Sequence, residues 1–109
     1  MMEQCEIRKV RDDPLLVALL CGGVEKYVVE VDPLDEKIAR VIVVDKAKDR
    51  RTSKLVRRDA VFDYLVNKTN SVDLARYIDK TLYYKERREL AEEVLNAPLI
   101  EAKVDSVIW

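Results

Sequence analysis

The sequence predicts an α+β fold: an antiparallel meander of four or five strands followed by two or three helices packed on one face, with a possible short C-terminal strand. The first half of the chain is rich in β-branched residues and is divided by turn signals at short intervals. After Asp59 the spacing of apolar residues changes from two to about 3.6, the helical period. Strands followed by helices is the order typical of α+β domains.

The length of 109 residues predicts a single α+β domain covering residues 1–109. Strands are expected from about 3 to 57, helices from about 59 to 96, and a tail or last strand over 98–109. Two glycines and three prolines are few for this length, so short loops are expected. The sequence contains no internal repeat and no linker.

The first strands are separated by clear turn signals. The segment EQCEIRKVR alternates weakly, which favours an edge or half-buried strand. The apolar run LLVALLC follows a turn at Asp12 to Pro14 and ends directly before Gly22 and Gly23. Two adjacent glycines between apolar runs predict a two-residue hairpin, because both positions can adopt positive φ. VEKYVVEV then returns as a strand with one solvated face.

The next strands follow a turn at DPLDEK, where Asp32 and Asp35 are expected to bond nearby backbone groups. KIARVIVVD has the β-branched composition of a central strand. If RTSKLVR is also extended, the two form a hairpin with the charged loop KAKD at its tip. The alternative is a helix beginning near Ser53. The strand is favoured because Asp59 is a good helix N-cap and helical spacing starts after it.

Two helices are expected after Asp59. The first has one apolar stripe, made of Val61, Phe62, Leu65 and Val66. The second is predicted to begin near Asn70 or Ser71, with an apolar face made of Ala75, Ile78 and Leu82. The next apolar group is rotated by roughly 120° from that face, so either the helix breaks near YYKERR or its halves pack against different surfaces. That group comprises Leu90, Ala91, Val94 and Leu95.

Composition gives an expected environment. The longest apolar run is far shorter than a bilayer span, and a soluble, cytoplasmic protein is expected, without a membrane partner. Cys5 and Cys21 match no cysteine-spacing motif, so two free thiols are expected in a reducing compartment. Charged residues make up 38% of the chain, which also contains one Gln and three Asn. That balance is typical of hyperthermophile proteins and predicts a hot-living source.

The sequence excludes several chemistries. It contains no histidine, which removes Ser/His/Asp and Cys/His catalysis and nearly all zinc sites. It has no glycine-rich phosphate loop. We therefore expect no catalytic residue, no metal and no small-molecule cofactor. A magnesium-dependent nuclease is a minor alternative, based on the acidic residues Asp32, Asp35, Glu36 and Asp45 with the neighbouring Lys37.

The most unusual passage is the basic segment 46–58. It contains seven cations and one anion, a net +6, although the whole chain has a net charge of −1. Four of the cations are arginines, whose planar groups match phosphate and stack on bases. We expect single-stranded DNA or RNA to bind here, beside a sheet face that holds unstacked bases. The candidate contacts are Lys46, Lys48, Arg50, Arg51, Ser53, Lys54, Arg57, Arg58 and Tyr27.

Two other interpretations stay open. The basic segment is a solvated surface if acids of the last helix neutralise it, namely Glu86, Glu89, Glu92 and Glu93. The protein is instead an interaction module or an accessory subunit, of viral or plasmid origin, if its C-terminal helix binds another protein. A homodimer is expected through the contacts Tyr83, Tyr84, Leu90, Val94 and Leu95. A helix-turn-helix over residues 61–82 is a minor option, because its second helix has a mixed outward charge.

Overall fold

The computed structural model describes residues 4–95 of the chain, with side chains described as far as residue 90. The chain divides into two compact units, residues 1–79 and 80–109, and each is described by itself. The expected C-terminal strand and the tail 98–109 lie outside the described residues. The single-domain expectation stays a prediction.

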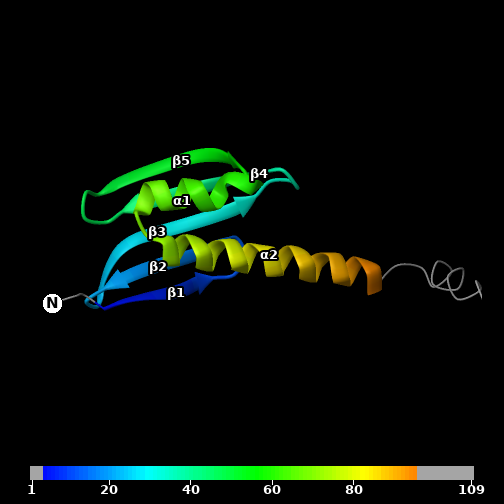
Figure 1. The fold of residues 1–109 in the computed structure, drawn as a ribbon, viewed down its shortest axis with the longest axis horizontal. Coiled ribbons are helices and arrows are strands. Elements are labelled where there is room, and N and C mark those ends of the chain that lie inside the picture. Colours follow the sequence, from blue (N-terminus) through cyan, green and yellow to red (C-terminus); the bar gives the residue numbers. More distant parts are fainter. Residues whose placement is uncertain (1–3, 96–109) are drawn as a thin grey trace, which may run out of the picture. The chain divides into compact units, whose positions relative to one another are not determined.

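Five strands form one antiparallel sheet, in the spatial order β1-β2-β3-β4-β5 (Figure 1). The predicted meander is therefore confirmed, with five strands. Each strand pairs with its neighbour in sequence, and the connections are short turns. The strands are β1 (Cys5–Arg11), β2 (Leu15–Cys21), β3 (Val24–Pro33), β4 (Ile38–Asp45) and β5 (Arg50–Arg57).

The turns form where the residue types predict, although Asp32 Oδ2 accepts a hydrogen bond from the Arg40 side chain and not from a nearby backbone group. Gly22 and Gly23 have φ of 62° and 81° and close the β2–β3 hairpin. Asp35 Oδ1 accepts hydrogen bonds from the Lys37 and Ile38 amides, at 2.7 and 2.8 Å, in the β3–β4 turn. RTSKLVR lies within β5 and pairs with β4, so the alternative of a helix beginning near Ser53 is wrong.

The helices begin after a short 3-10 turn, η1 (Arg58–Ala60). The N-cap of α1 (Val61–Thr69) is Ala60, without a side-chain cap, so Asp59 is not the N-cap that the sequence predicted. The 3-10 turn places Asp59 before the capping position, and Asp59 Oδ2 accepts a hydrogen bond from Arg57 Nη2 at 2.9 Å. The predicted start of the second helix is confirmed, because the Leu74 amide donates to Ser71 Oγ at 3.2 Å.

The second helix, α2 (Val72–Leu95), is continuous over 24 residues. The predicted alternative of a break near YYKERR is therefore wrong. The boundary between the two compact units falls within this helix, after Asp79. Within residues 4–95, neither helix combines the length and the apolar character that a bilayer-crossing segment requires.

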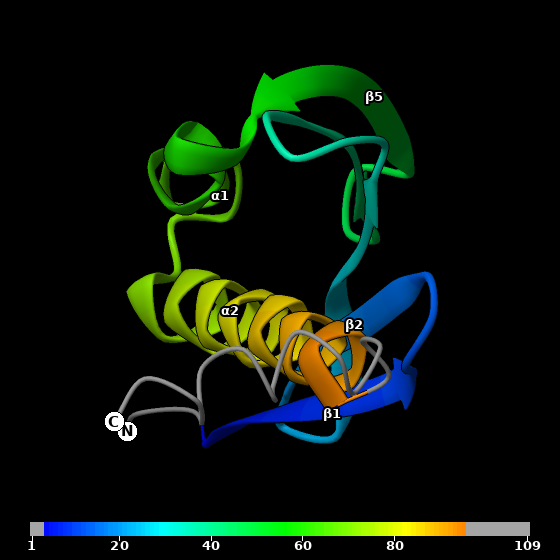
Figure 2. The same ribbon diagram turned by 90° about the vertical axis from the view of Figure 1, so that its right-hand side faces the viewer.

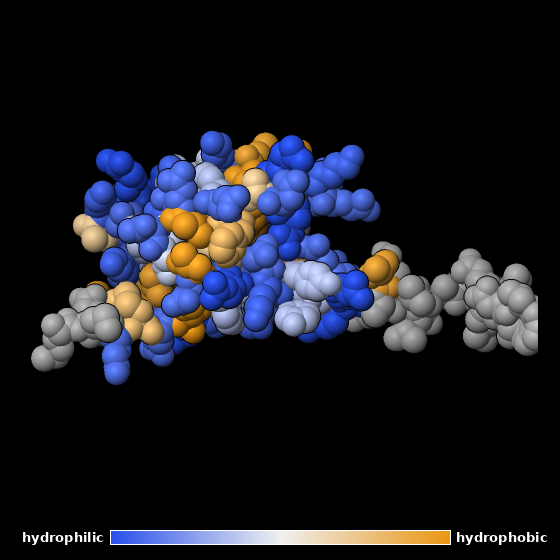
Figure 3. All heavy atoms as spheres, in the orientation of Figure 1, coloured by the Kyte–Doolittle hydropathy of each residue, from blue (hydrophilic) through white to orange (hydrophobic). Residues whose placement is uncertain are grey.

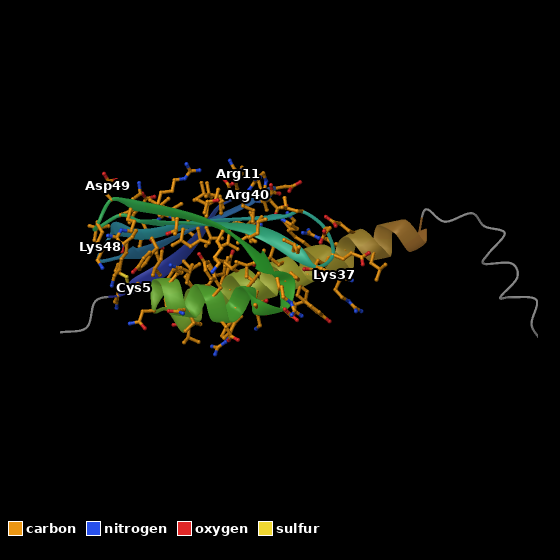
Figure 4. All side chains as sticks on the ribbon, turned by 90° about the horizontal axis from the view of Figure 1, so that it is seen from above. Cys5, Arg11, Lys37, Arg40, Lys48 and Asp49 are labelled. Atoms are coloured by element: carbon orange, nitrogen blue, oxygen red, sulfur yellow. A yellow bond between two sulfur atoms is a disulfide. The ribbon has the colours of Figure 1, made fainter. Side chains whose placement is uncertain are left out.

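The two faces of the sheet differ in cover. On the inner face, Val17, Val29 and Val41 are fully buried, and so are Leu65 of α1 and Leu74 of α2. Helix α1 contacts β4 and β5 on this side, whereas the opposite side of the sheet, the outer face, carries no helix within residues 4–79 (Figures 2 and 4). Viewed onto the helices, the surface is mostly hydrophilic, with apolar side chains between α1 and the first turns of α2 (Figure 3).

A disulfide joins Cys5 of β1 to Cys21 of β2, so the expectation of two free thiols is wrong. The two residues are register partners on adjacent strands, with their Cα atoms 4.0 Å apart. Within β1 only Ile7 is partly buried, and the remaining side chains are exposed. Backbone pairing and the disulfide therefore hold β1 more than side-chain burial does.

Reduction of this disulfide is expected to lower the free energy of unfolding by about 3 kcal/mol, because the bond closes a short loop in the unfolded chain. Urea denaturation with and without a dithiol reductant measures the difference, and a thiol titration of the unfolded, unreduced protein should find no free thiol. The matched control is the double variant Cys5→Ser with Cys21→Ser, which should be insensitive to the reductant. Equal stability of the oxidised and reduced protein would contradict this role.

Candidate nucleic-acid interface

The basic segment forms the β4–β5 turn and the edge strand β5, and strand alternation divides its side chains between two faces. Arg51 and Ser53 are the register partners of Val44 and Ile42, and Arg57 is the partner of Ile38, all on the outer face. Arg50 and Lys54 alternate with them and lie on the inner side. The predicted contacts are therefore not on one continuous surface.

The end of the segment is already engaged by acids. Arg57 Nη2 lies 2.9 Å from Asp59 Oδ2, with both side chains exposed. Arg58 Nη1 lies 2.9 Å from Asp79 Oδ1 of α2, and the Arg58 side chain is only 18% exposed. Its backbone amide also donates to the Lys37 carbonyl at 2.7 Å. Arg58 therefore fastens η1 to the sheet and to α2 and offers little surface to a ligand.

The turn of the hairpin is different. Lys48, Arg50 and Arg51 are exposed and have no acidic partner within the described part of the chain. Figure 4 shows Lys48 and Asp49 at one end of the sheet and Lys37 at the other. Lys46 lies 3.6 Å from Glu25 Oε1, and both side chains are about half exposed. An exposed pair of that length contributes little and is easily exchanged for another partner.

Lys54 is part of an arrangement around Tyr64 of α1. The Nζ atoms of Lys54 and Lys68 lie 5.7 and 5.8 Å from the centroid of the Tyr64 ring, a cation–π distance. The Tyr64 hydroxyl is buried and has no hydrogen-bond partner among residues 4–95, and burial raises the pKa of this phenol above its ordinary value. Two ammonium groups without a described acidic partner thus lie near the same aromatic ring.

Six cations without an acidic partner gather where β3, β4, β5 and α1 meet. Lys26 is counted with them because its carbonyl accepts a hydrogen bond from the Lys46 amide at 3.0 Å, which places its backbone beside the β4–β5 turn; Lys26 also lines the cavity that contains Tyr27. Asp45 and Asp49 of the turn are the acids among them, which leaves a net charge of +4. We call this group the basic cluster: Lys26, Lys48, Arg50, Arg51, Lys54 and Lys68.

The basic cluster contrasts with the cations elsewhere in residues 4–79. On the outer face, Arg8 pairs with Glu6 and Arg40 with Asp32, at 2.8 and 3.1 Å, and Arg11 pairs with Glu30. Outside the cluster, Lys37 is the one cation of this unit with no acidic partner among the described residues. Unbalanced positive charge is therefore concentrated at one end and edge of the sheet.

Tyr27 lies on the inner face, not beside Arg51 and Ser53. It lines a cavity of about 480 Å³ together with Ile7, Leu19 and the residues that begin α2. The outer-face positions of β1 to β5 carry no aromatic side chain in the described structure. The sheet thus brings together the predicted cations Lys48, Arg50 and Arg51 but provides no outer-face aromatic side chain beside Arg51.

Sequence reasoning missed Lys26 and Lys68. Lys26 lies 20 residues before the basic segment 46–58, and Lys68 lies ten residues after it. Only strand register and the direction of α1 bring these two lysines near the segment. Lys68 carries one usable signal, since it is one helical turn after Tyr64. Lys26 carries none, because a lysine near the start of a strand is ordinary.

The residues expected at an oligomer contact belong to the second unit. Tyr83 and Tyr84 are exposed, with ring centroids 5.7 Å apart, and Arg87 lies over the Tyr83 ring. Leu90 is 55% exposed. The side chains of Val94 and Leu95 lie outside the described residues, as do those of Glu92 and Glu93.

The carboxylates of the nuclease alternative are separated by their local roles. Asp32 forms an ion pair with Arg40, and Asp35 closes the β3–β4 turn. Asp45 Oδ1 accepts a hydrogen bond from the Lys48 amide at 3.2 Å. Among the described residues no three acidic or cysteine side chains converge as metal ligands.

Comparisons with protein-family models, with curated proteins and with solved structures found no match.

Arg58→Ala is expected to lower the free energy of unfolding by about 1–2 kcal/mol, because it removes a charge-assisted bond of a mostly buried side chain and leaves Asp79 without that partner. The matched control is Arg51→Ala, an exposed arginine without an acidic partner in residues 4–95, which should change stability by less than about 0.5 kcal/mol. Urea denaturation followed by circular dichroism gives both values. Equal losses in the two variants would refute the distinction.

Tyr64→Phe is expected to leave the free energy of unfolding unchanged or to raise it by up to about 1 kcal/mol, because it removes a buried hydroxyl with no described partner and keeps the ring beneath the two lysines. Thermal and urea unfolding measure the change. A clear loss of stability would show that the hydroxyl makes a hydrogen bond.

Proposed function

We propose that the protein binds nucleic acid, through the phosphates, at the basic cluster. The observation that carries the proposal is the partition of charge. Six cations with no described acidic partner share one end and edge of the sheet, whereas the outer-face arginines of β1 and β4 are paired with acids. A local excess of positive charge in a chain of net charge −1 is the usual electrostatic footprint of a polyanion site.

The shape of the site supports backbone contact rather than base reading. Strand β5 is an edge strand, and its cations project to both sides of it. A rise of about 3.4 Å per residue separates Arg50 from Lys54 by roughly 14 Å, enough to reach several successive phosphates. The ligand that we propose is single-stranded DNA or RNA, because a flexible strand can bend over such a rim.

The absence of an outer-face aromatic among the described residues changes the expected mode of binding. Base stacking on the sheet, which the sequence suggested, has no Tyr, Phe or Trp to serve it there. On the outer face, phosphate contacts and stacking on the planar group of Arg51 are then the contacts that the site can make. Such binding is expected to be nearly independent of sequence. We propose a binding role without catalysis, since the chain has no histidine.

Affinity is expected to fall with salt, with a slope of log K against log [salt] near −3.5 if about five phosphates of a single strand are neutralised. Arg51→Glu is expected to weaken binding at least tenfold, and the triple variant Lys48→Glu, Arg50→Glu, Arg51→Glu at least a hundredfold, since each reversal removes one phosphate contact and repels another. Fluorescence anisotropy with oligo-dT, oligo-U and a duplex at two ionic strengths measures both effects.

The matched control is Lys37→Glu, which makes the same change of charge at an exposed lysine at the other end of the sheet (Figure 4). It should retain most of the affinity. An equal loss in Lys37→Glu and Arg51→Glu would mean that only net charge matters. Wild-type affinity in the triple variant would exclude the basic cluster as the site.

A second candidate is an interaction module that uses α2. Tyr83, Tyr84 and Leu90 are 49%, 63% and 55% exposed on this helix, which is unusual for three large side chains so close in sequence. Such a group is typical of a surface that binds another protein. Absence of oligonucleotide binding by the wild-type chain removes the first candidate and leaves this one.

A further inference from the structure

Strand β2 is apolar toward both faces of the sheet, and so are residues 41–44 of β4. An antiparallel sheet with one solvated face normally alternates apolar and polar residues, whereas a strand covered on both sides reads as a continuous apolar run. In β2 the sequence LLVALLC contains no polar side chain apart from the disulfide-bonded cysteine. In β4, Ile42 and Val44 face outward between the buried Val41 and Val43. This pattern indicates that something covers the outer face.

The outward apolar side chains are contiguous across the central strands. Ala18, Val28 and Val44 are successive register partners on β2, β3 and β4. One step along the strands, Leu16 and Ile42 flank Glu30 in the same way. We call these five apolar residues the outer patch. Apart from the small Ala18, its members are only half-buried within residues 4–79.

Most charges around the outer patch are paired, and Arg51 of β5, the register partner of Val44, is the one outer-face arginine with no acidic partner among the described residues. Three arginines from β1 and β4 are each paired with a carboxylate, Arg8 with Glu6, Arg11 with Glu30 and Arg40 with Asp32. A border in which most charges are paired, with one unpaired arginine at the β5 edge, does not strongly repel a copy of itself. It can exchange its intramolecular ion pairs for equivalent pairs with an identical surface, so the face is complementary in charge to itself.

We infer that two copies of the chain pack outer face against outer face, as a β-sandwich with aligned strands. Five strands spaced about 4.8 Å apart, four of them seven or eight residues long and β3 ten residues long, give a face of roughly 24 by 25 Å, on the order of 600 Å² for each copy. Two such faces bury about 1,200 Å², at the lower limit for specific interfaces. The dimer is therefore expected to dissociate on dilution. The inference is independent of the proposed function.

The experiment measures the mass of the full chain in solution by light scattering and sedimentation over a wide range of concentration. The wild type should approach twice 12.7 kDa as concentration rises. Ile42→Glu places a charge in the centre of the outer patch and should weaken the dimer at least tenfold. Ile42→Thr keeps the β-branched shape and should weaken it less, which protects the test if the glutamate disturbs folding. Circular dichroism confirms that each variant is folded.

The matched control is Leu34→Glu, which puts the same charge at an apolar residue that is 49% exposed and lies in the β3–β4 turn, outside the outer patch. It should dimerise like the wild type. A wild type that stays monomeric at every concentration overturns the inference. A dimer that survives Ile42→Glu also overturns the inference. Loss of the dimer in the Leu90→Glu variant would instead indicate that the two copies contact one another through α2.

Discussion

The register of the antiparallel meander is the constraint on which the rest of the structure depends. Because side chains alternate along a strand, pairing Arg51 with Val44 sends Arg51 and Ser53 outward and leaves Lys54 beside Tyr64. A slip of one residue would reverse every one of these assignments. The same register brings Cys5 opposite Cys21 and Tyr27 beside Asp45. The disulfide, the cavity and the basic cluster are therefore consequences of one pattern of backbone pairing.

Charge is distributed so that two surfaces of the same sheet have different properties. Both edge strands carry several cations, which by itself protects exposed edges from pairing with other chains. In β1 those cations lie beside acids, as Arg8 does beside Glu6, and the field of such a pair fades quickly with distance. In β5, Arg50 and Arg51 have no acid partner among residues 4–95. Protection of a sheet edge explains why β5 carries cations, but it does not explain why acidic partners are lacking around them. The contrast with the paired cations of β1 is therefore consistent with the proposed anionic ligand at β5.

Local signals predicted local structure well, and failed where distant segments decide. The glycine pair, the Asp35 turn and the Ser71 cap depend on a few adjacent residues, and the structure confirms each. The Cys5–Cys21 bond depends on register across a hairpin, which no cysteine spacing reveals. The face on which Tyr27 lies follows from pairing with β2 and β4, and Lys68 joins Lys54 only because α1 runs back along the sheet. Asp59 is suited to capping, but the 3-10 turn moves the cap to Ala60.

The two proposals combine into one mechanical argument. If outer faces pair, the helix-covered inner side of each sheet lies outside the contact. Arg50, Lys54 and Lys68 then stay accessible, whereas Arg51 lies on the paired face. Two clusters then belong to one rigid body. A strand long enough to reach both gains from effective concentration, and one too short to span them does not. Affinity would then increase with oligonucleotide length in the dimeric protein but not in a monomeric variant that keeps every cation. That difference separates the contribution of the sheet face from the contribution of the charges.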